Sequence, residues 1–483
     1  MKAHVVLGFV VAATAVVPLS GCDTGPPGQP AADPVIPAGQ MNVVCTYSHS
    51  AADDSIVYPR RPGKAMEHDF FGNTTADAFS TGPSLRAEPV STCENVADAS
   101  AYWLPSLRLA NGKVIPPTYQ KTYYNNQAGY VSNNHYAVQP YPENLQMLAG
   151  SHTGTTPNVN VHFLCTGAGY TSEIPTACTP HPVKGTQFDI AIAFPTCWDG
   201  DNLAPMIHRG MNNMAYPAAS GSCPADYPVR LPLLNFNVAY QVGHVTSLAG
   251  TELSMDPTLD ADGNVVQLNW GSLYTSHADF INAWQPESAQ YMVDYCLNRA
   301  TACGKNVPYS YRDAGADSTA VEGVRHATNF GSDPTVTVRA DNGTTAQSVA
   351  YLRFEIPPGA LEFPVRFKPS YRLRLYGGNV SGTSTRTLNV YATSTGWSES
   401  SLTADNAPAC GGSPVAHFTL DDKQGYRDIY VTNTVNAAMA EGQTHISLCV
   451  KAGDGDPDTF TFDSREGTNK PVLGLFGITP TGY

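Results

Sequence analysis

Short apolar or alternating runs, each the length of one strand, constrain the fold of this chain most strongly. Runs such as VNVHFLC (159–165), FDIAIAF (188–194) and the segment 229–242 are separated by clusters of Pro, Gly and Asn. The chain holds 42 Gly and 38 Pro, and only 14% of its residues are charged. Strand-length runs between turn-forming clusters are typical of β proteins. We therefore predict a mainly β chain with two β-sandwich-like domains, the first of them rich in loops.

The second half alternates more regularly than the first. Six segments have the period of two expected when one strand face is buried. They are VAYLRFEI, YRLRLY, TLNVYA, DIYVT, HISLCV and PVLGLFGI, between residues 349 and 478. The first half holds one notable predicted helix, residues 278–299, where Phe280, Ile281 and Trp284 recur at near-helical spacing. Asp279 would cap the start of that helix.

Cysteine parity indicates an oxidising compartment and two separately closed units. The chain has eleven cysteines. If Cys22 is lipidated, ten remain, eight before about residue 305 and two after it, so each half can pair internally. The sequence contains no C-x-x-C pair, the spacing that would indicate a cysteine zinc site. The predicted domains are 41–305 and 309–483.

The first residues have the pattern of an export signal. One lysine precedes an apolar run, and Leu19-Ser20-Gly21-Cys22 resembles the bacterial lipobox, so residues 1–21 are expected to be cleaved and Cys22 lipidated. Residues 22–40, rich in Pro, Gly and Ala, then form a flexible tether. We expect an exported protein held at the cell envelope, in contact with the membrane through its lipid anchor only.

Net charge and missing motifs exclude several classes of function. The formal charge of −14 disfavours nucleic acid as a partner. The chain contains no G-x-S-x-G elbow, H-E-x-x-H or Walker sequence, which disfavours serine hydrolases, zincins and nucleotide enzymes.

Two known families resemble the two halves. The second half is similar to the DNRLRE β-sandwich modules found beside carbohydrate-active enzymes, through HATNFG (326–331), YLRF (351–354), GWSES (396–400), RDIYVT (427–432), FDSRE (462–466) and PVL (471–473). The first half resembles the secreted domain-of-unknown-function family number nineteen ninety-six, through HDFFGN (68–73), YW (102–103), YYN (123–125), FPTCWDG (194–200), MAYP (214–217), LP (231–232) and HADFINAW (277–284). This second resemblance implies histidines where Met66 and Asn213 stand here.

Three polar and aromatic clusters form the predicted site of the first half. We predict that His68, Asp69, Trp198, Asp199, His277 and Asp279 converge on one cleft, with Tyr102, Trp103 and Trp198 as platforms for sugar rings. Paired acids could cleave a glycosidic bond, or a histidine with Tyr124 could act as a lyase. A local account competes, in which the aspartates make turns or caps and the histidines fill gaps. The sequence assigns no metal to this site.

Two further features concern ligands. Arg366, Lys368, Arg372 and Arg374 share one strand parity, so they would form a basic strip that could attract an acidic polysaccharide; a solvated outer face is the alternative. The runs Asp454–Asp458 and Asp260–Gly263 offer oxygens that could hold calcium, although neither contains a full EF-hand loop. No cofactor is otherwise indicated.

Three functions remain open from the sequence. The chain could bind a polysaccharide or cell-wall glycan at the cell surface. It could also cleave one as a glycoside hydrolase or lyase with an attached binding module. The third alternative is a structural or adhesion protein of the cell envelope. All three are compatible with exported β-sandwiches, so the choice depends on the site.

Overall fold

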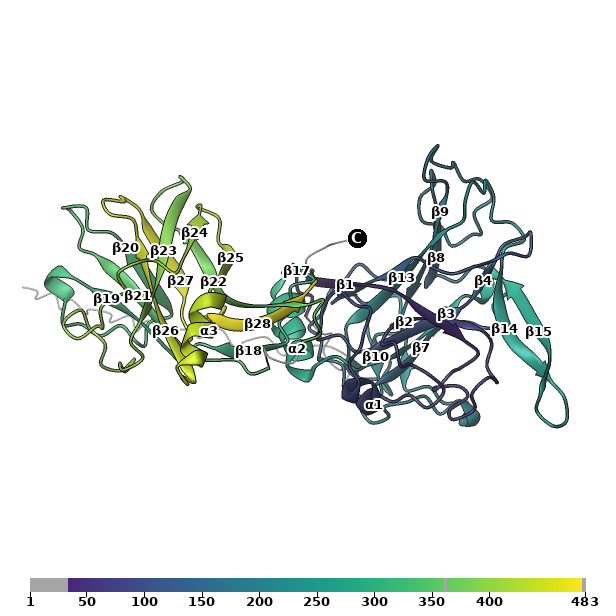
Figure 1. The fold of residues 1–483 in the computed structure, drawn as a ribbon. Helices are drawn as coiled ribbons and strands as arrows, with labels where there is room; N and C mark the ends of the chain where they lie inside the picture. Colours follow the sequence, from purple (N-terminus) through teal and green to yellow (C-terminus); the bar gives the residue numbers. More distant parts are fainter. Residues whose placement is uncertain (1–33, 360–362, 480–483) are drawn as a thin grey trace, which may run out of the picture. The chain divides into compact units, whose positions relative to one another are not determined.

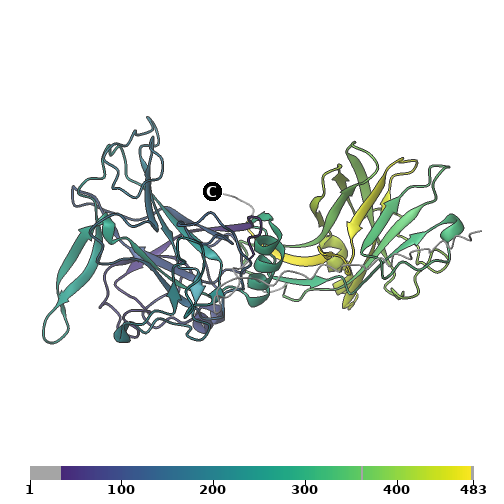
Figure 2. The same cartoon turned by 180° about the vertical axis from the view of Figure 1, so that it is seen from behind.

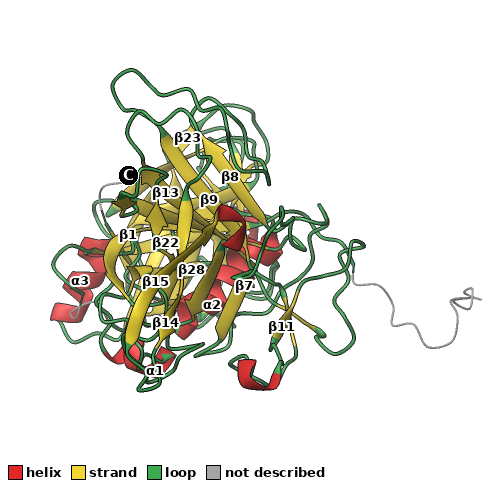
Figure 3. Cartoon of the chain, turned by 90° about the vertical axis from the view of Figure 1, so that its right-hand side faces the viewer, coloured by secondary structure: helices red, strands yellow, loops and turns green. Residues whose placement is uncertain are grey.

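The structure is a computed structural model that describes residues 34–359 and 363–479. The expectations for residues 1–33, including the export signal and the lipid anchor at Cys22, lie outside this range. Strands dominate both halves of the chain and helices are short and few (Figures 1 and 3). The predicted fold class is therefore confirmed. No helix among the described residues is long and apolar enough to cross a membrane.

The first half is built on two layers joined by one long strand. Its sheet follows the order β7 (Gln146–Gly150), β16 (His277–Ile281), β3 (Ala101–Pro105), β2 (His68–Gly72), β1 (Gln40–Ala51), β6 (Tyr119–Asn125), β13 (Leu233–Gln241), β9 (Gln187–Ala193) and β8 (Val161–Cys165), with β17 (Ala302–Gly304) parallel to β1. The beginning of β1 pairs with β6 and its end pairs with β2. The strand thus passes from one layer to the other.

The core of the first half lies between these layers. Phe71 and Tyr102 project from the β2 and β3 layer onto Phe236 of β13, with ring centroids 5.9 Å apart in both pairs. The opposite face of the same layer carries a second cluster around Phe70, Trp103 and Ile281, which also contains a buried leucine of α1 (Gly82–Ala87). Both faces of the β2–β3–β16 layer are consequently buried.

Two small sheets complete the first half. One contains β11 (Met214–Ala215), β10 (Cys197–Trp198) and β12 (Val229–Arg230); the other contains β15 (Val265–Ser272), β14 (Glu252–Leu259), β4 (Leu107–Arg108) and β5 (Val114–Ile115). In Figure 1, β14 and β15 form a hairpin that extends beyond the larger sheet.

The predicted helix 278–299 is wrong over its first residues. Residues 277–281 form β16, which pairs with β3 and β7, and α2 begins only at Pro286 (Pro286–Tyr291). A π-helical turn (Met292–Cys296) and a 3₁₀ turn (Leu297–Arg299) follow. Phe280 and Ile281 bury on opposite faces of a sheet instead of one face of a helix. Proline at the first helical position marks the true start.

The second half is antiparallel throughout, and Figure 2 shows it from behind. Its strand order is β18 (Ser310–Asp313), β28 (Val472–Ile478), β22 (Lys368–Asn379), β27 (Thr459–Asp463), β20 (Thr335–Arg339), β21 (Ser348–Glu355), β26 (His445–Ala452), β23 (Arg386–Thr393) and β24 (Ala416–Leu420), with β19 (Ala316–Val321) beside β21 and β25 (Gly425–Tyr430) beside β22. All six predicted strands are present. The sequence did not predict the helix α3 (Thr432–Ala440).

The disulfides follow the predicted division of the cysteines. Four bridges close within the first half and one within the second: Cys45–Cys93, Cys165–Cys178, Cys197–Cys223, Cys296–Cys303 and Cys410–Cys449. The expectation of pairing inside each half is confirmed.

Candidate functional site

Three polar side chains from two strands meet on the layer formed by β7, β16, β3 and β2. They lie on its outer face, which points away from the other layer. Phe70 of β2, Trp103 of β3 and Asp279 of β16 align across the three strands, and their side chains therefore share one face. His68 and His277 lie two residues before Phe70 and Asp279, so period-two alternation places them on that face too. One ligand atom each from His68, His277 and Asp279 lies within 4.8 Å of the other two.

The two imidazole rings stand at right angles over a tightly packed backbone. The ring centroids of His68 and His277 are 6.2 Å apart, with an interplanar angle of 89°. Opposite His277 on β7 lies Gly150, whose φ is +82°. A Cβ at this position would come within 2.7 Å of the His277 Cα, so only glycine lets β7 approach here.

Backbone hydrogen bonds fix the tautomer of both histidines. His68 Nδ1 lies 3.0 Å from the Asp53 carbonyl oxygen, and His277 Nδ1 lies 2.8 Å from that of Thr275. A carbonyl oxygen can only accept, so each Nδ1 carries the hydrogen and donates it. In the neutral rings, each Nε2 keeps its lone pair. This lone pair has no hydrogen-bond partner at the buried His68 Nε2.

Burial keeps all three groups uncharged in the protein alone. Desolvation lowers the pKa of His68 to about 4 and that of His277 to about 3. Desolvation also raises the pKa of Asp279 well above its ordinary value, and the nearby Asp54 carboxylate adds to the effect. Such opposed shifts in one cluster are typical of functional sites.

The cluster opens onto a cavity of about 270 Å³. His277 and Asp279 line the cavity, and His152 lines it as well, with its ring centroid 6.1 Å from that of His277. Met66 contributes an apolar wall where the family resemblance implied a histidine. Two further acids of the wall are Asp54 and Asp256, and no lysine or arginine lines the cavity among the described residues.

Asp69 does not belong to this cluster. It faces the interior between the layers, and its Oδ1 accepts hydrogen bonds from the hydroxyls of Ser50 at 2.5 Å and Ser106 at 2.8 Å. Alternation along β2 turns Asp69 away from its neighbour His68. The predicted acid pair of Asp69 with Asp279 is therefore wrong, because the sheet separates the two carboxyl groups.

Trp198 and Asp199 have local structural roles, as the competing interpretation of the sequence expected. The Asp199 Oδ1 accepts from the backbone N–H groups of Asp201 and Asn202, both at 2.9 Å, which is a turn made by an aspartate. The Trp198 Nε1 donates to the Asn202 carbonyl oxygen at 2.8 Å. Neither residue lines the cavity beside His277. The prediction that they join the histidines in one cleft is wrong.

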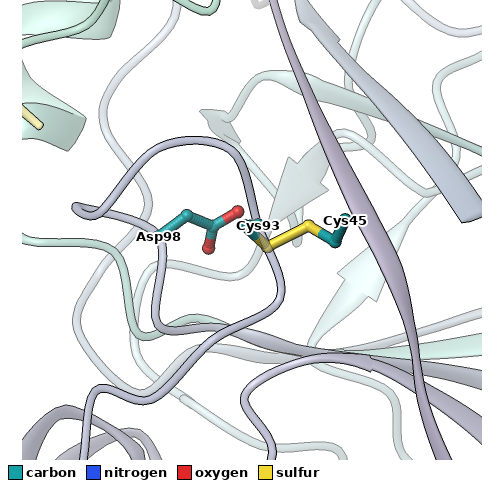
Figure 4. A group of neighbouring side chains, drawn as sticks. All are labelled: Cys45, Cys93 and Asp98. Carbon is teal, nitrogen blue, oxygen red and sulfur yellow. A yellow bond between two sulfur atoms is a disulfide. The ribbon is translucent and has the colours of Figure 1, made fainter. Parts of the chain in front are cut away.

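Two of the predicted aromatic platforms, Tyr102 and Trp103, and the predicted lyase residue Tyr124 are core residues. Tyr102, Trp103 and Tyr124 are each at most 1% exposed, so they cannot present a face to a sugar. The Tyr102 hydroxyl donates to the Asp98 Oδ2 at 2.8 Å and lies 2.5 Å from the Tyr124 hydroxyl. The lyase scheme with Tyr124 fails for the same reason. Asp98 itself lies beside the Cys45–Cys93 disulfide (Figure 4), whose bonded sulfurs are not metal ligands.

A groove that suits a glycan lies elsewhere, on the outer face of the layer formed by β6, β13, β9 and β8. Its volume is about 530 Å³, and its lining consists of tyrosine, amide and histidine side chains: Gln40, Tyr123, Asn125, Gln127, Tyr130, His162, Tyr170, Asn235 and Asn237. The outward positions of β6 and β13 supply Tyr123, Asn125, Asn235 and Asn237. Asparagines at alternate positions of an apolar strand were the sequence signal for this face. We did not predict this face from the sequence.

The amides of the groove are already oriented by its tyrosines. The Tyr130 hydroxyl donates to Asn235 Oδ1 at 2.6 Å, and the Tyr170 hydroxyl donates to Asn237 Oδ1 at 3.3 Å. Tyr170 is 53% exposed, so its ring is accessible. Exposed aromatic faces together with fixed amide groups match the apolar faces and the hydroxyls of sugar rings.

Only half of the predicted basic strip of the second half is exposed. Arg372 and Arg374 are 9% and 5% exposed, and the Arg374 guanidinium pairs with both oxygens of Asp428 at 2.8 and 3.2 Å. Arg366 and Lys368 do lie on the surface, and Arg366 donates to a backbone carbonyl oxygen at 3.1 Å. Leu373 and Leu375 do point into the core, as predicted. The residues predicted to face the interior do so, but the opposite face is also covered at Arg372 and Arg374.

The two acidic runs considered for calcium have other partners. Asp260 accepts from the backbone N–H groups of Asp262 and Asn264 in the turn of the β14–β15 hairpin. Asp458 pairs with Arg386 at 2.8 Å. A third acidic group, Asp317 with Glu399 and Glu466, surrounds Arg465, which supplies the positive charge.

Family comparisons cover most of the chain in two parts. Residues 54–284 match the family model of a domain of unknown function, DUF1996, and residues 308–477 match carbohydrate-binding module family 96. The first match agrees with the expected resemblance; the second supports a carbohydrate-binding type of module without the narrower DNRLRE name. No curated protein matches the chain.

The fold and these matches define the class of protein. The chain combines a β-sandwich region of unsettled activity with a region similar to a carbohydrate-binding module, which suggests that the protein binds carbohydrate. His68, His277 and Asp279 all lie inside the range that matches the domain of unknown function.

Proposed function

We propose that this protein is an exported polysaccharide-binding protein anchored at the cell envelope. The observation that carries the proposal is the match of residues 308–477 to a carbohydrate-binding module. The groove of the first half supports it, because a second surface of tyrosines and amides would extend contact along a polymer. No charged residue lines that groove among the described residues, which favours a neutral glycan over a polyuronate.

The groove can be tested with the mature protein and a panel of polysaccharides. A neutral β-glucan, a xylan and a polyuronate are offered to the wild type by affinity electrophoresis or calorimetry. We expect Tyr170→Ala to weaken binding of a neutral polymer about tenfold, since one stacked ring contributes on the order of 1 kcal/mol. Phe79→Ala, which removes another exposed aromatic ring outside the groove, should bind as the wild type does.

The outcomes separate the candidate functions. Binding without new reducing ends or unsaturated sugars supports a binding protein. Release of oligosaccharides would show that the protein is an enzyme. Its catalytic groups would then be neither the acid pair of Asp69 with Asp279 nor a histidine with Tyr124. Failure of the wild type to bind any polymer would contradict the proposal and favour a structural role in the envelope.

Anchoring through Cys22 is a separate part of the proposal. Its support is the lipobox-like Leu19 to Cys22 and the tether that follows. Radiolabelled fatty acid should enter the wild type and not Cys22→Ser, and the variant should be released from the membrane fraction. Equal label in both proteins would show that Cys22 is not the anchor.

A further inference from the structure

Three of the unpartnered buried atoms of the first half lie close together. His68 and Asp279 are each 1% exposed. Neither His68 Nε2 nor either carboxyl oxygen of Asp279 has a hydrogen-bond partner among the described residues. A buried polar atom without a partner costs free energy, and native proteins hold few of them. Three such atoms, on two side chains whose ligand atoms lie within 4.8 Å of each other, indicate a missing bound group.

The chemistry of these atoms specifies a cation. Each histidine donates its Nδ1 hydrogen to a backbone carbonyl and presents the Nε2 lone pair, which is the arrangement that orients metal-ligating histidines. Asp279 adds an oxygen acceptor. Three carboxyl groups (Asp54, Asp256 and Asp279) line the cavity without a lysine or arginine among its described walls. An anion would leave these lone pairs unmatched.

The ligand set distinguishes among cations. Calcium and magnesium prefer oxygen ligands, whereas two imidazoles with one carboxylate suit zinc or another divalent transition metal. Structural zinc sites close their coordination with four protein ligands, while sites that react or bind substrate keep a position open. Here three ligands converge, and two of them, His277 and Asp279, also line the cavity.

We propose that His68, His277 and Asp279 bind one divalent transition-metal ion of the Zn²⁺ type. The His68 and His277 Nε2 atoms and an Asp279 oxygen are the ligands, and at least one coordination position opens toward the cavity. The site is independent of the glycan groove, which lies on the other layer. The protein can therefore bind this metal whether or not the proposed glycan function is correct.

Metal uptake by the full mature chain tests the proposal. The protein is stripped with a chelator, titrated with ZnCl₂ by calorimetry, and analysed for bound zinc after dialysis. One equivalent should bind to the wild type. His277→Gln and Asp279→Asn should each weaken affinity at least about a hundredfold, because each removes a direct ligand. Asp262→Asn, which changes an exposed carboxyl group in the turn of the β14–β15 hairpin, should keep the wild-type affinity.

Cobalt substitution gives a reading that does not depend on stable variants. Co²⁺ bound by two imidazoles and a carboxylate should give visible d–d absorption in the wild type, and one equivalent of Zn²⁺ should abolish that absorption. Less than half an equivalent of zinc in the wild type would overturn the proposal. So would an equal loss of affinity in Asp262→Asn and Asp279→Asn, or full affinity in Asp279→Asn. Polysaccharide binding measured on the same samples tests the glycan proposal separately.

Discussion

Both halves of the chain bury polar side chains at alternate positions of a strand. The halves differ in whether these side chains have hydrogen-bond or charge partners within the fold. On β22, Arg374 pairs with Asp428, and Arg372 stacks on the rings of Phe476 and Tyr430, at 4.3 and 4.8 Å from the ring centroids. On β16, the carboxyl oxygens of Asp279 have no partner. Among the described residues, every unpartnered buried side-chain atom lies in the first half, apart from Ser318 Oγ.

This difference separates structural polar groups from candidate functional ones. A polar group that stabilises the fold has its partner within the fold, as the Arg374 guanidinium has in Asp428. A group that serves a ligand keeps its lone pairs available until the ligand arrives, at a cost to stability. The comparison assigns β22 to the scaffold and β16 to the site, although both strands carry the same alternating pattern in the sequence.

The largest expected effect is the loss of the ion pair between the buried Arg374 of β22 and the partly exposed Asp428. Arg374→Met removes the charged hydrogen bonds of the buried guanidinium to Asp428 and to the Tyr291 hydroxyl, which should lower the free energy of unfolding by about 3 kcal/mol. Lys368→Met, on the same strand and exposed, should change it by less than about 0.5 kcal/mol. Urea unfolding of both variants measures this difference. Equal stability of the two would break the comparison, because Arg374 would then not be a structural group.

The sequence predicted the second half better than the first, for a physical reason. Its strands alternate with period two, and this pattern gives both the strand and its buried face, as for Leu373 and Leu375. Whether the other face is covered depends on distant segments, so the burial of Arg372 and Arg374 could not be read locally. In the first half, residues 280–284 have apolar spacing that fits a helix, and only the pairing with β3 and β7 shows that residues 277–281 form a strand.

The candidate site shows the same limit. His68 and His277 were identified from their surroundings in the sequence, and the structure does bring them together with Asp279. The residues predicted to accompany them lie on the wrong side of their strands. Asp69 is one residue from His68 and faces the opposite side, and Tyr124 is buried while its neighbour Tyr123 lines the groove. Choosing between adjacent residues requires knowing which side of each strand faces the core. That information lies in the sheet register and not in local composition.

A smaller effect tests whether a partnered acid of the first half behaves as a structural group. Asp98 is fully buried and accepts hydrogen bonds from the Tyr102 hydroxyl and the Ser100 N–H at 2.8 and 3.1 Å. Burial raises the pKa of Asp98 from 3.8 to about 7, although these two hydrogen bonds lower it. The folded protein therefore holds this proton more tightly than the unfolded chain does. The contribution of Asp98 to stability is greatest below pH 4, is lost as the pH rises from about 4 to 7, and is constant above that range.

Urea unfolding between pH 4 and pH 8 measures this contribution. One group can change the free energy of unfolding by at most about 1.4 kcal/mol per pH unit, and the loss should approach this slope between about pH 4 and pH 7. Asp98→Asn should lower the slope of this dependence, because the amide does not titrate and can still hydrogen-bond to Tyr102. Asp262→Asn, in the exposed turn of the β14–β15 hairpin, should keep the wild-type slope. If Asp98→Asn keeps that slope as well, Asp98 is ionised in the folded protein across this range. The interior of the first half would then tolerate a buried charge that hydrogen bonds alone stabilise, and the distinction drawn between its partnered and unpartnered groups would be weaker than the structure indicates.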